Sequence, residues 1–146
     1  MSQSKTPLPL EGIRVLDVSQ VMAGPFACML LGDLGADVIK VEPPTGDQTR
    51  SSMGFKLKGD DSLGFLNMNR NKRSIALNLA SEAGRDVFRE LAREADILVE
   101  NFRVGKMDEW GLAYDDLADR YNTAVRRTAM TELVVENDAR TARREG

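Results

Sequence analysis

One stretch, residues 12–42, constrains the fold more than any other, because an apolar segment, a turn, a helical pattern and a second apolar segment follow one another there. Segment 13–18 is a nearly continuous apolar run, which is typical of a strand buried on both faces of a parallel sheet, and segment 36–42 has the pattern of a second buried strand. Pro25 suits the first position of the helix, and Gly35 suits the left-handed residue that ends many helices. Residues at helical spacing lie between them: Phe26, Met29, Leu30 and Leu34. The stretch therefore predicts a βαβ unit.

A second strand–helix–strand pattern follows and extends the same sheet. Segment 74–79 alternates as a third strand, Ser81 suits the N-cap of a helix, and segment 97–99 is a fourth strand. The helix after Ser81 has one apolar face, made by Ala83, Val87, Phe88, Leu91, Ala92 and Ala95. Repeated strand–helix units predict an α/β fold, a Rossmann-like, doubly wound and mainly parallel sheet.

The remaining segments are less regular. We expect a long surface loop over 45–61, a short helix over 62–68, and one or two short helices over 106–121. Segment 123–146 is polar and carries few large apolar residues, so we expect a helical or disordered tail. The predicted organisation is a domain over 1–122 and a divergent tail over 123–146.

Composition excludes several classes of function. A net charge of −3 argues against a nucleic-acid partner. The chain has no histidine and one cysteine, Cys28, in an apolar run, which excludes a His/Cys metal site and a histidine-based catalytic triad and predicts a buried, inert thiol. No apolar run approaches the ~18 residues of a membrane span, so we expect a cytoplasmic protein without metal or membrane.

In a doubly wound sheet, ligands bind at the carboxyl ends of the strands. The helix that begins near Pro25 offers free N–H groups to an anion there, but every helix has such an end. Glu42 ends the second strand, where an acid can hold a ribose. The preceding turn, however, supplies only Gly24 where a dinucleotide fingerprint needs three glycines, which argues against a nicotinamide or flavin site.

Two further features have a structural and a functional interpretation. Arg50 and the basic run 69–73 could meet phosphates, although a solvated surface is the favoured interpretation. Asp17 lies inside an apolar strand and must find a partner or face a cleft, and a structural role is favoured.

Six short strings in order resemble a known family. They are LEGIRVLD (10–17), MAGPF (22–26), GADVIKVEPP (35–44), NKRSIALNL (71–79), ADILVENFR (95–103) and GLAYDDL (111–117). Together they resemble the start of class III CoA-transferases of the CaiB/BaiF type, a family that includes formyl-CoA transferase, carnitine CoA-transferase and alpha-methylacyl-CoA racemase. The resemblance covers about residues 8–121.

The resemblance implies a truncated, CoA-binding Rossmann-like domain whose substrates are an acyl-CoA and a small carboxylate. The family's CoA contacts fall on Val21, Met22, Ala23, Leu77, Asn78, Leu79, Ala80, Asn101, Phe102 and Arg103. The chain departs from the family's pattern at two positions. It has Pro43 where some members have an arginine after the second strand, and it has Glu109 and Trp110 where an arginine often precedes the glycine that corresponds to Gly111. Family members form interlocked homodimers, so the resemblance also implies a second copy as partner.

The resemblance also implies a catalytic mechanism, together with the expectation that this chain lacks a residue the mechanism needs. The family's catalytic aspartate attacks the thioester to form an anhydride and then an enzyme–CoA thioester, and it lies beyond the end of this chain. We therefore expect the N-terminal part of a CoA-transferase that is inactive alone. The alternatives are a non-catalytic CoA-binding or dimerisation module, a degraded remnant, and an alpha-methylacyl-CoA racemase-like fragment.

Overall fold

The structure is a computed structural model that describes residues 6–56, 59 and 61–121, with the backbone alone for residues 119–121. The predicted tail over 123–146 lies outside the described residues, so its nature and the boundary near residue 122 stay predictions.

Four strands form one sheet in the order β3-β2-β1-β4, and every neighbouring pair is parallel. Their bounds are β1 Arg14–Asp17, β2 Asp37–Glu42, β3 Lys72–Ala76 and β4 Ile97–Val99. Leu16 lies at the centre of the register, opposite Ile39 on one side and Leu98 on the other. The predicted fold class, an α/β, Rossmann-like parallel sheet, is confirmed.

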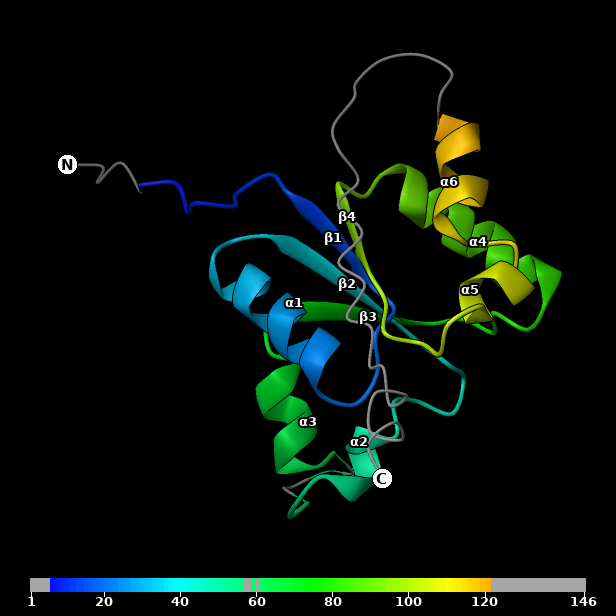
Figure 1. The fold of residues 1–146 in the computed structure, drawn as a ribbon. Coiled ribbons are helices and arrows are strands. Elements are labelled where there is room, and N and C mark those ends of the chain that lie inside the picture. The colour runs from blue at the N-terminus through cyan, green and yellow to red at the C-terminus, as the bar shows by residue number, and fades with distance from the viewer. Residues whose placement is uncertain (1–5, 57–58, 60, 122–146) are drawn as a thin grey trace, which may run out of the picture.

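Helices cover both faces of this sheet (Figure 1). On one face Cys28 of α1 packs with Val15 and Val38, and on the other Phe88 of α4 packs with Leu16. The helices are α1 Ala23–Asp33, α2 Thr49–Ser52, α3 Leu63–Met68, α4 Glu82–Arg93, α5 Lys106–Glu109 and α6 Tyr114–Tyr121. Where one or two short helices were predicted over 106–121, the structure has two, α5 and α6.

Helix α1 differs in detail from the prediction. Pro25 occupies its third position, where the missing N–H is still not needed. Gly35 ends it as predicted, with φ of 104°, and the amides of Gly35 and Ala36 donate to Gly32 and Leu31 in a Schellman motif. Of the four residues whose spacing indicated the helix, only Met29 is buried. A continuous row of apolar side chains on α1, here called the α1 stripe, is about half exposed: Met22, Phe26, Leu30 and Leu34.

Other elements depart from the prediction at their bounds and in their burial. Strand β3 begins at Lys72, two residues earlier than predicted, and the expected surface loop contains α2 with Asp47 and Thr49 buried. Ser62 and Ser81 are N-caps, as their side chains accept hydrogen bonds from Phe65 and Gly84. On α4, the predicted apolar face includes Val87, which is 43% exposed, whereas Arg89 is buried.

Candidate functional site at the carboxyl edge of the sheet

The order of the strands reverses at β1, whose carboxyl end therefore marks the switch point of the sheet. Asn101, just after β4, bridges the two chain exits there. Its Oδ1 accepts a hydrogen bond from the Gln20 amide at 2.7 Å, and its Nδ2 donates to the Gln20 carbonyl at 2.8 Å. One side chain thus fixes the position of the turn between β1 and α1.

A pocket of about 130 Å³ opens beside this turn. Phe102 and Trp110 form one wall, with their rings edge to face at 5.2 Å. The full lining is Val18, Gln20, Val41, Glu42, Pro43, Leu77, Asn78, Leu79, Ala80, Phe102 and Trp110. Five of the ten residues predicted to contact CoA line it together, namely Leu77, Asn78, Leu79, Ala80 and Phe102.

The other five predicted residues lie around this pocket without lining it. Asn101 holds Gln20 by a hydrogen bond. Arg103 pairs with Glu109, a residue at which the chain departs from the family's pattern. Val21 and Met22, both about half exposed, lead into α1, which begins at Ala23.

Val21 adopts a backbone conformation that valine rarely takes, with φ of 66°. Its neighbours hold it there, because Asn101 fixes Gln20 on one side and Gly24 packs against Ser19 on the other. A Cβ added at Gly24 would lie 2.3 Å from the Ser19 Cβ, so only glycine permits this approach. Strain of this kind is concentrated at functional sites in proteins.

A second, larger pocket of about 520 Å³ shares Gln20 and Pro43 with the first. Its remaining lining comes from the segment around α2: Thr45, Gly46, Asp47, Gln48, Arg50, Ser51, Lys56 and Asp61. The two pockets therefore meet where the chain leaves β1 and β2.

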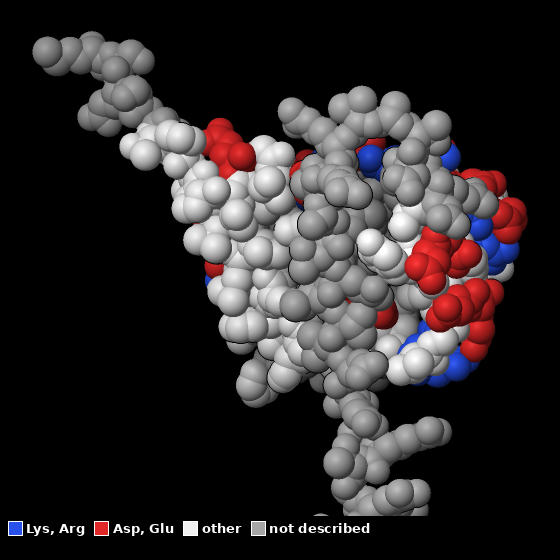
Figure 2. Space-filling view, turned by 45° about the horizontal axis from the view of Figure 1, so that its top comes forward, with Lys and Arg blue, Asp and Glu red and all other residues white. Residues whose placement is uncertain are grey.

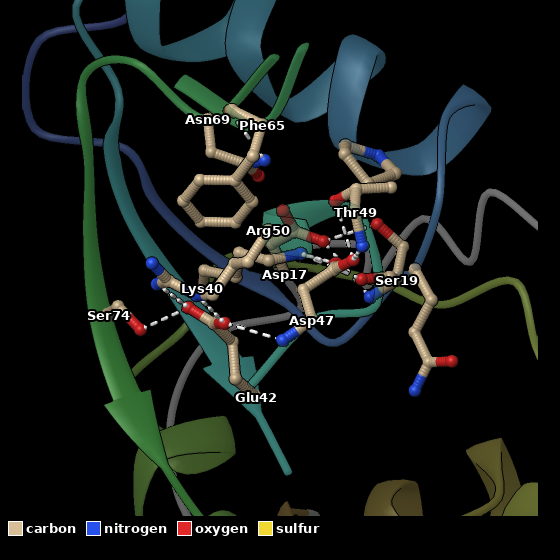
Figure 3. Close-up of polar contacts among 12 residues, drawn as sticks. Asp17, Ser19, Lys40, Glu42, Asp47, Thr49, Arg50, Phe65, Asn69 and Ser74 are labelled. Atoms are coloured by element: carbon tan, nitrogen blue, oxygen red, sulfur yellow. Dashed lines mark hydrogen bonds and ion pairs between the residues drawn. The ribbon is translucent and has the colours of Figure 1, made fainter. Parts of the chain in front are cut away.

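Glu42, the acid considered for a ribose, is fully engaged within the protein (Figure 3). Arg50 donates to both of its carboxylate oxygens at 2.7 Å, and Ser74 Oγ and the Asp47 amide donate at 2.5 and 2.9 Å. Burial alone would raise the pKa of Glu42, but these hydrogen bonds outweigh it and lower the pKa to about 2. Glu42 is thus ionised at neutral pH and anchors Arg50.

Asp17 has the buried partner that its position in the strand required. Its carboxylate lies 2.8 Å from Lys72 Nζ and also accepts hydrogen bonds from the amide and hydroxyl of Ser19. Burial lowers the pKa of Lys72 although Asp17 opposes the shift. Burial, and then the charge of Asp17, raise the pKa of Cys28 to about 12, so this thiol stays protonated, as an inert thiol should.

Lys40 is a charged residue of this region that the sequence analysis missed. Its side chain is 1% exposed, and its Nζ lies 2.9 Å from Asp47 Oδ2 and 3.0 Å from the Ser19 carbonyl (Figure 3). Burial raises the pKa of Asp47, but hydrogen bonds from Thr49 and the adjacent Lys40 ammonium outweigh this and lower it. A lysine inside an apolar strand was the signal that could have identified it.

The basic run has carboxylate partners rather than an open cationic face. Arg70 pairs with Asp33, Lys72 with Asp17 and Arg73 with Asp37. On the face drawn in Figure 2, acidic and basic side chains are interspersed over the side formed by α4, α5 and α6. Among the residues that the structure describes, no helix has both the length and the apolar composition needed to cross a bilayer.

Comparison with known proteins identifies close relatives. Residues 10–126 match the model of CoA-transferase family III. The chain is 53% identical over 110 residues to succinyl-CoA:glutarate CoA-transferase of Mus musculus, an alignment that covers 75% of the chain and 25% of that protein. It is 47% identical over 118 residues to the succinyl-CoA–L-malate CoA-transferase beta subunit of Chloroflexus aurantiacus, an alignment that covers 81% of the chain and 29% of that protein.

A solved structure agrees with these matches. A CaiB/BaiF family protein from Brucella suis superposes with a TM-score of 0.73 at 42% identity, covering 78% of the chain and 31% of that protein. The chain therefore spans between 25% and 31% of the length of these relatives.

Proposed function

Because the chain belongs to CoA-transferase family III, we propose that it is the CoA-binding N-terminal part of an enzyme that moves CoA between an acyl-CoA and a carboxylic acid. The observation that carries the proposal is the pocket beside the β1 turn, where five residues predicted from the resemblance lie together. Ligand binding at this edge is also what the strand order favours.

The pocket suits a ligand that has both apolar and polar parts. Leu77, Phe102 and Trp110 provide apolar contact area, whereas Gln20 and Asn78 provide hydrogen-bonding groups at its rim. CoA has this mixed character, with a flat base, a pantetheine arm and phosphates. We propose that Val21, Met22, Ala23, Asn101 and Arg103 complete the site when CoA is bound.

Catalysis is proposed to require more than this chain. By resemblance, the carboxylate that forms the anhydride and the enzyme–CoA thioester belongs to a segment C-terminal to the matched residues. We expect no CoA transfer between acyl-CoA donors and small carboxylates with the purified chain. Robust turnover would contradict this part of the proposal.

Calorimetric titration with CoA tests binding, and two alanines make a matched pair. Ala80 is exposed at the pocket, so Ala80→Trp should fill the pocket without disturbing the core, and CoA affinity should fall at least tenfold. Ala83, exposed on α4 away from the pocket lining, is the control, and Ala83→Trp should bind like the wild type. Absence of CoA binding by the wild type would favour a degraded remnant.

We also propose a second copy of the chain as a partner and the cytoplasm as its location. The α1 stripe supports the partner, because four large apolar side chains in a row leave a contiguous apolar surface on one helix. The same feature favours the alternative of a dimerisation module that binds CoA without catalysis.

A further inference from the structure

Lys40 joins two segments that are otherwise far apart along the chain. Its Nζ contacts the Ser19 carbonyl, at the exit of β1, and Asp47 Oδ2, in the segment that leads into α2. Removing an ammonium from water is costly unless its partners are in place. Both segments must therefore hold their positions whenever Lys40 is buried.

Each partner of Lys40 is directly connected to a pocket wall. Ser19 precedes Gln20, which lines both pockets, and Asp47 itself lines the larger one. Asp47 Oδ1 also accepts hydrogen bonds from the amide and hydroxyl of Thr49 at 2.8 and 2.6 Å. The Lys40 side chain is thus a link between the two walls.

The link made by Lys40 matters because the turn that contains Val21 is strained. Val21 keeps its left-handed conformation only while the surrounding contacts determine it. Lys40 of β2 holds Ser19, and Asn101, just after β4, holds Gln20, so the two residues before Val21 are both fixed by side chains from elsewhere in the chain.

We propose that Lys40 and Asp47 are a positioning pair that fixes the 19–22 turn against the 47–52 segment and so sets the opening between the two pocket walls. The effect on a ligand rests on the proposed CoA-binding function. The effect on the turn does not, because it follows from the contacts alone.

The test removes the ion pair without leaving a buried charge. Lys40→Met/Asp47→Asn keeps the side-chain volumes and the acceptor for Thr49 but eliminates the Lys40–Asp47 attraction and the bond to Ser19. Val38→Ala is the control, since Val38 is buried at the other end of β2, and urea is used to bring the wild type and both variants to equal stability. Hydrogen exchange then measures the exchange rates of the Gln20 and Thr49 amides, which are hydrogen-bonded in the native protein.

In the double variant, both amides should exchange at least tenfold faster than in Val38→Ala, and CoA affinity should fall at least tenfold by calorimetry. Equal exchange in the two variants would overturn the proposal. If the wild type binds no CoA, the proposed function fails, while the exchange comparison still decides whether Lys40 positions the turn. In Lys40→Arg, which keeps the charge, the amides of Gln20 and Thr49 should exchange more slowly than in the double variant. Equally fast exchange in these two variants would also count against the pair.

Discussion

At the scale of single residues, the carboxyl edge is held by ionised groups that are almost fully buried. Such a charge needs a partner within reach, and a lone sequence identifies the need but not the partner. The apolar neighbours of Asp17 predict that it needs a partner, and the same reasoning applies to Lys40, but the sequence identifies neither partner, Lys72 or Asp47. Pairings of this kind depend on tertiary structure, which explains why the resemblance placed five of the eleven lining residues at the pocket, whereas the Lys40–Asp47 pair was not predicted.

Glu42→Gln should lower stability in a pH-dependent way. The pKa of Glu42 is lowered from 4.5 to about 2, so its carboxylate stabilises the fold above pH 4.5, and this contribution is lost as the pH falls toward 2. Urea unfolding at pH 7 should show a loss on the order of 3 kcal/mol, and the two proteins should converge near pH 2. Glu90→Gln, an exposed control at 69% side-chain exposure, should cost less than about 1 kcal/mol. A pH-independent loss would contradict the prediction.

Val21→Gly tests the strained turn. The left-handed conformation costs a valine about 1–2 kcal/mol, and glycine avoids this cost. Glycine also makes the unfolded chain more flexible, which lowers the stability of the folded state by about 0.5–1 kcal/mol. We expect unchanged or slightly increased stability in urea unfolding. Val104 is 83% exposed in a loop and has no positive φ, so Val104→Gly should lose about 0.5–1 kcal/mol. Equal losses in both variants would show that Val21 is unstrained.

At the scale of elements, the strand–helix alternation was sufficient to predict the sheet, but not which side of α1 faces it. Almost every residue from Phe26 to Leu34 is apolar or small, so spacing alone could not separate the buried side from the exposed one. The buried side of α1 consists of Gly24, Pro25, Cys28 and Met29, and Gly24 allows the helix to approach Ser19 closely in the turn after β1.

Gly24→Ala should disturb this approach. Its new methyl group would collide with Ser19, so α1 would have to move, at a cost of about 1–3 kcal/mol. Gly32→Ala in the same helix is the comparison. Its methyl group would lie 3.3 Å from the Asn71 Cβ, a tight contact but a much milder one than at Gly24, and the substitution gains helix propensity worth about 1 kcal/mol. Thermal unfolding should therefore rank Gly24→Ala well below Gly32→Ala, and the reverse order would argue against the close approach.

At the scale of the whole molecule, the α1 stripe should govern self-association. Phe26→Glu places a charge in the stripe, and the weight-average mass in sedimentation equilibrium should fall toward that of one 16.1 kDa chain. Phe55 is more exposed, at 84%, but lies outside the stripe, so Phe55→Glu should leave the mass unchanged. A wild type that sediments as a monomer at every concentration would contradict the role of the stripe.

The central place of β1 also has a consequence for synthesis. Its partner on one side, β2, follows after one helix, but Val99 of β4 lies 82 residues after its register partner Asp17 (99 − 17). At roughly 5–20 residues per second, a ribosome needs on the order of 4–16 s to cover that distance. During this interval the emerging chain presents β1 with one edge unpaired, and slower translation before β4 would lengthen the time in which a wrong strand can pair there.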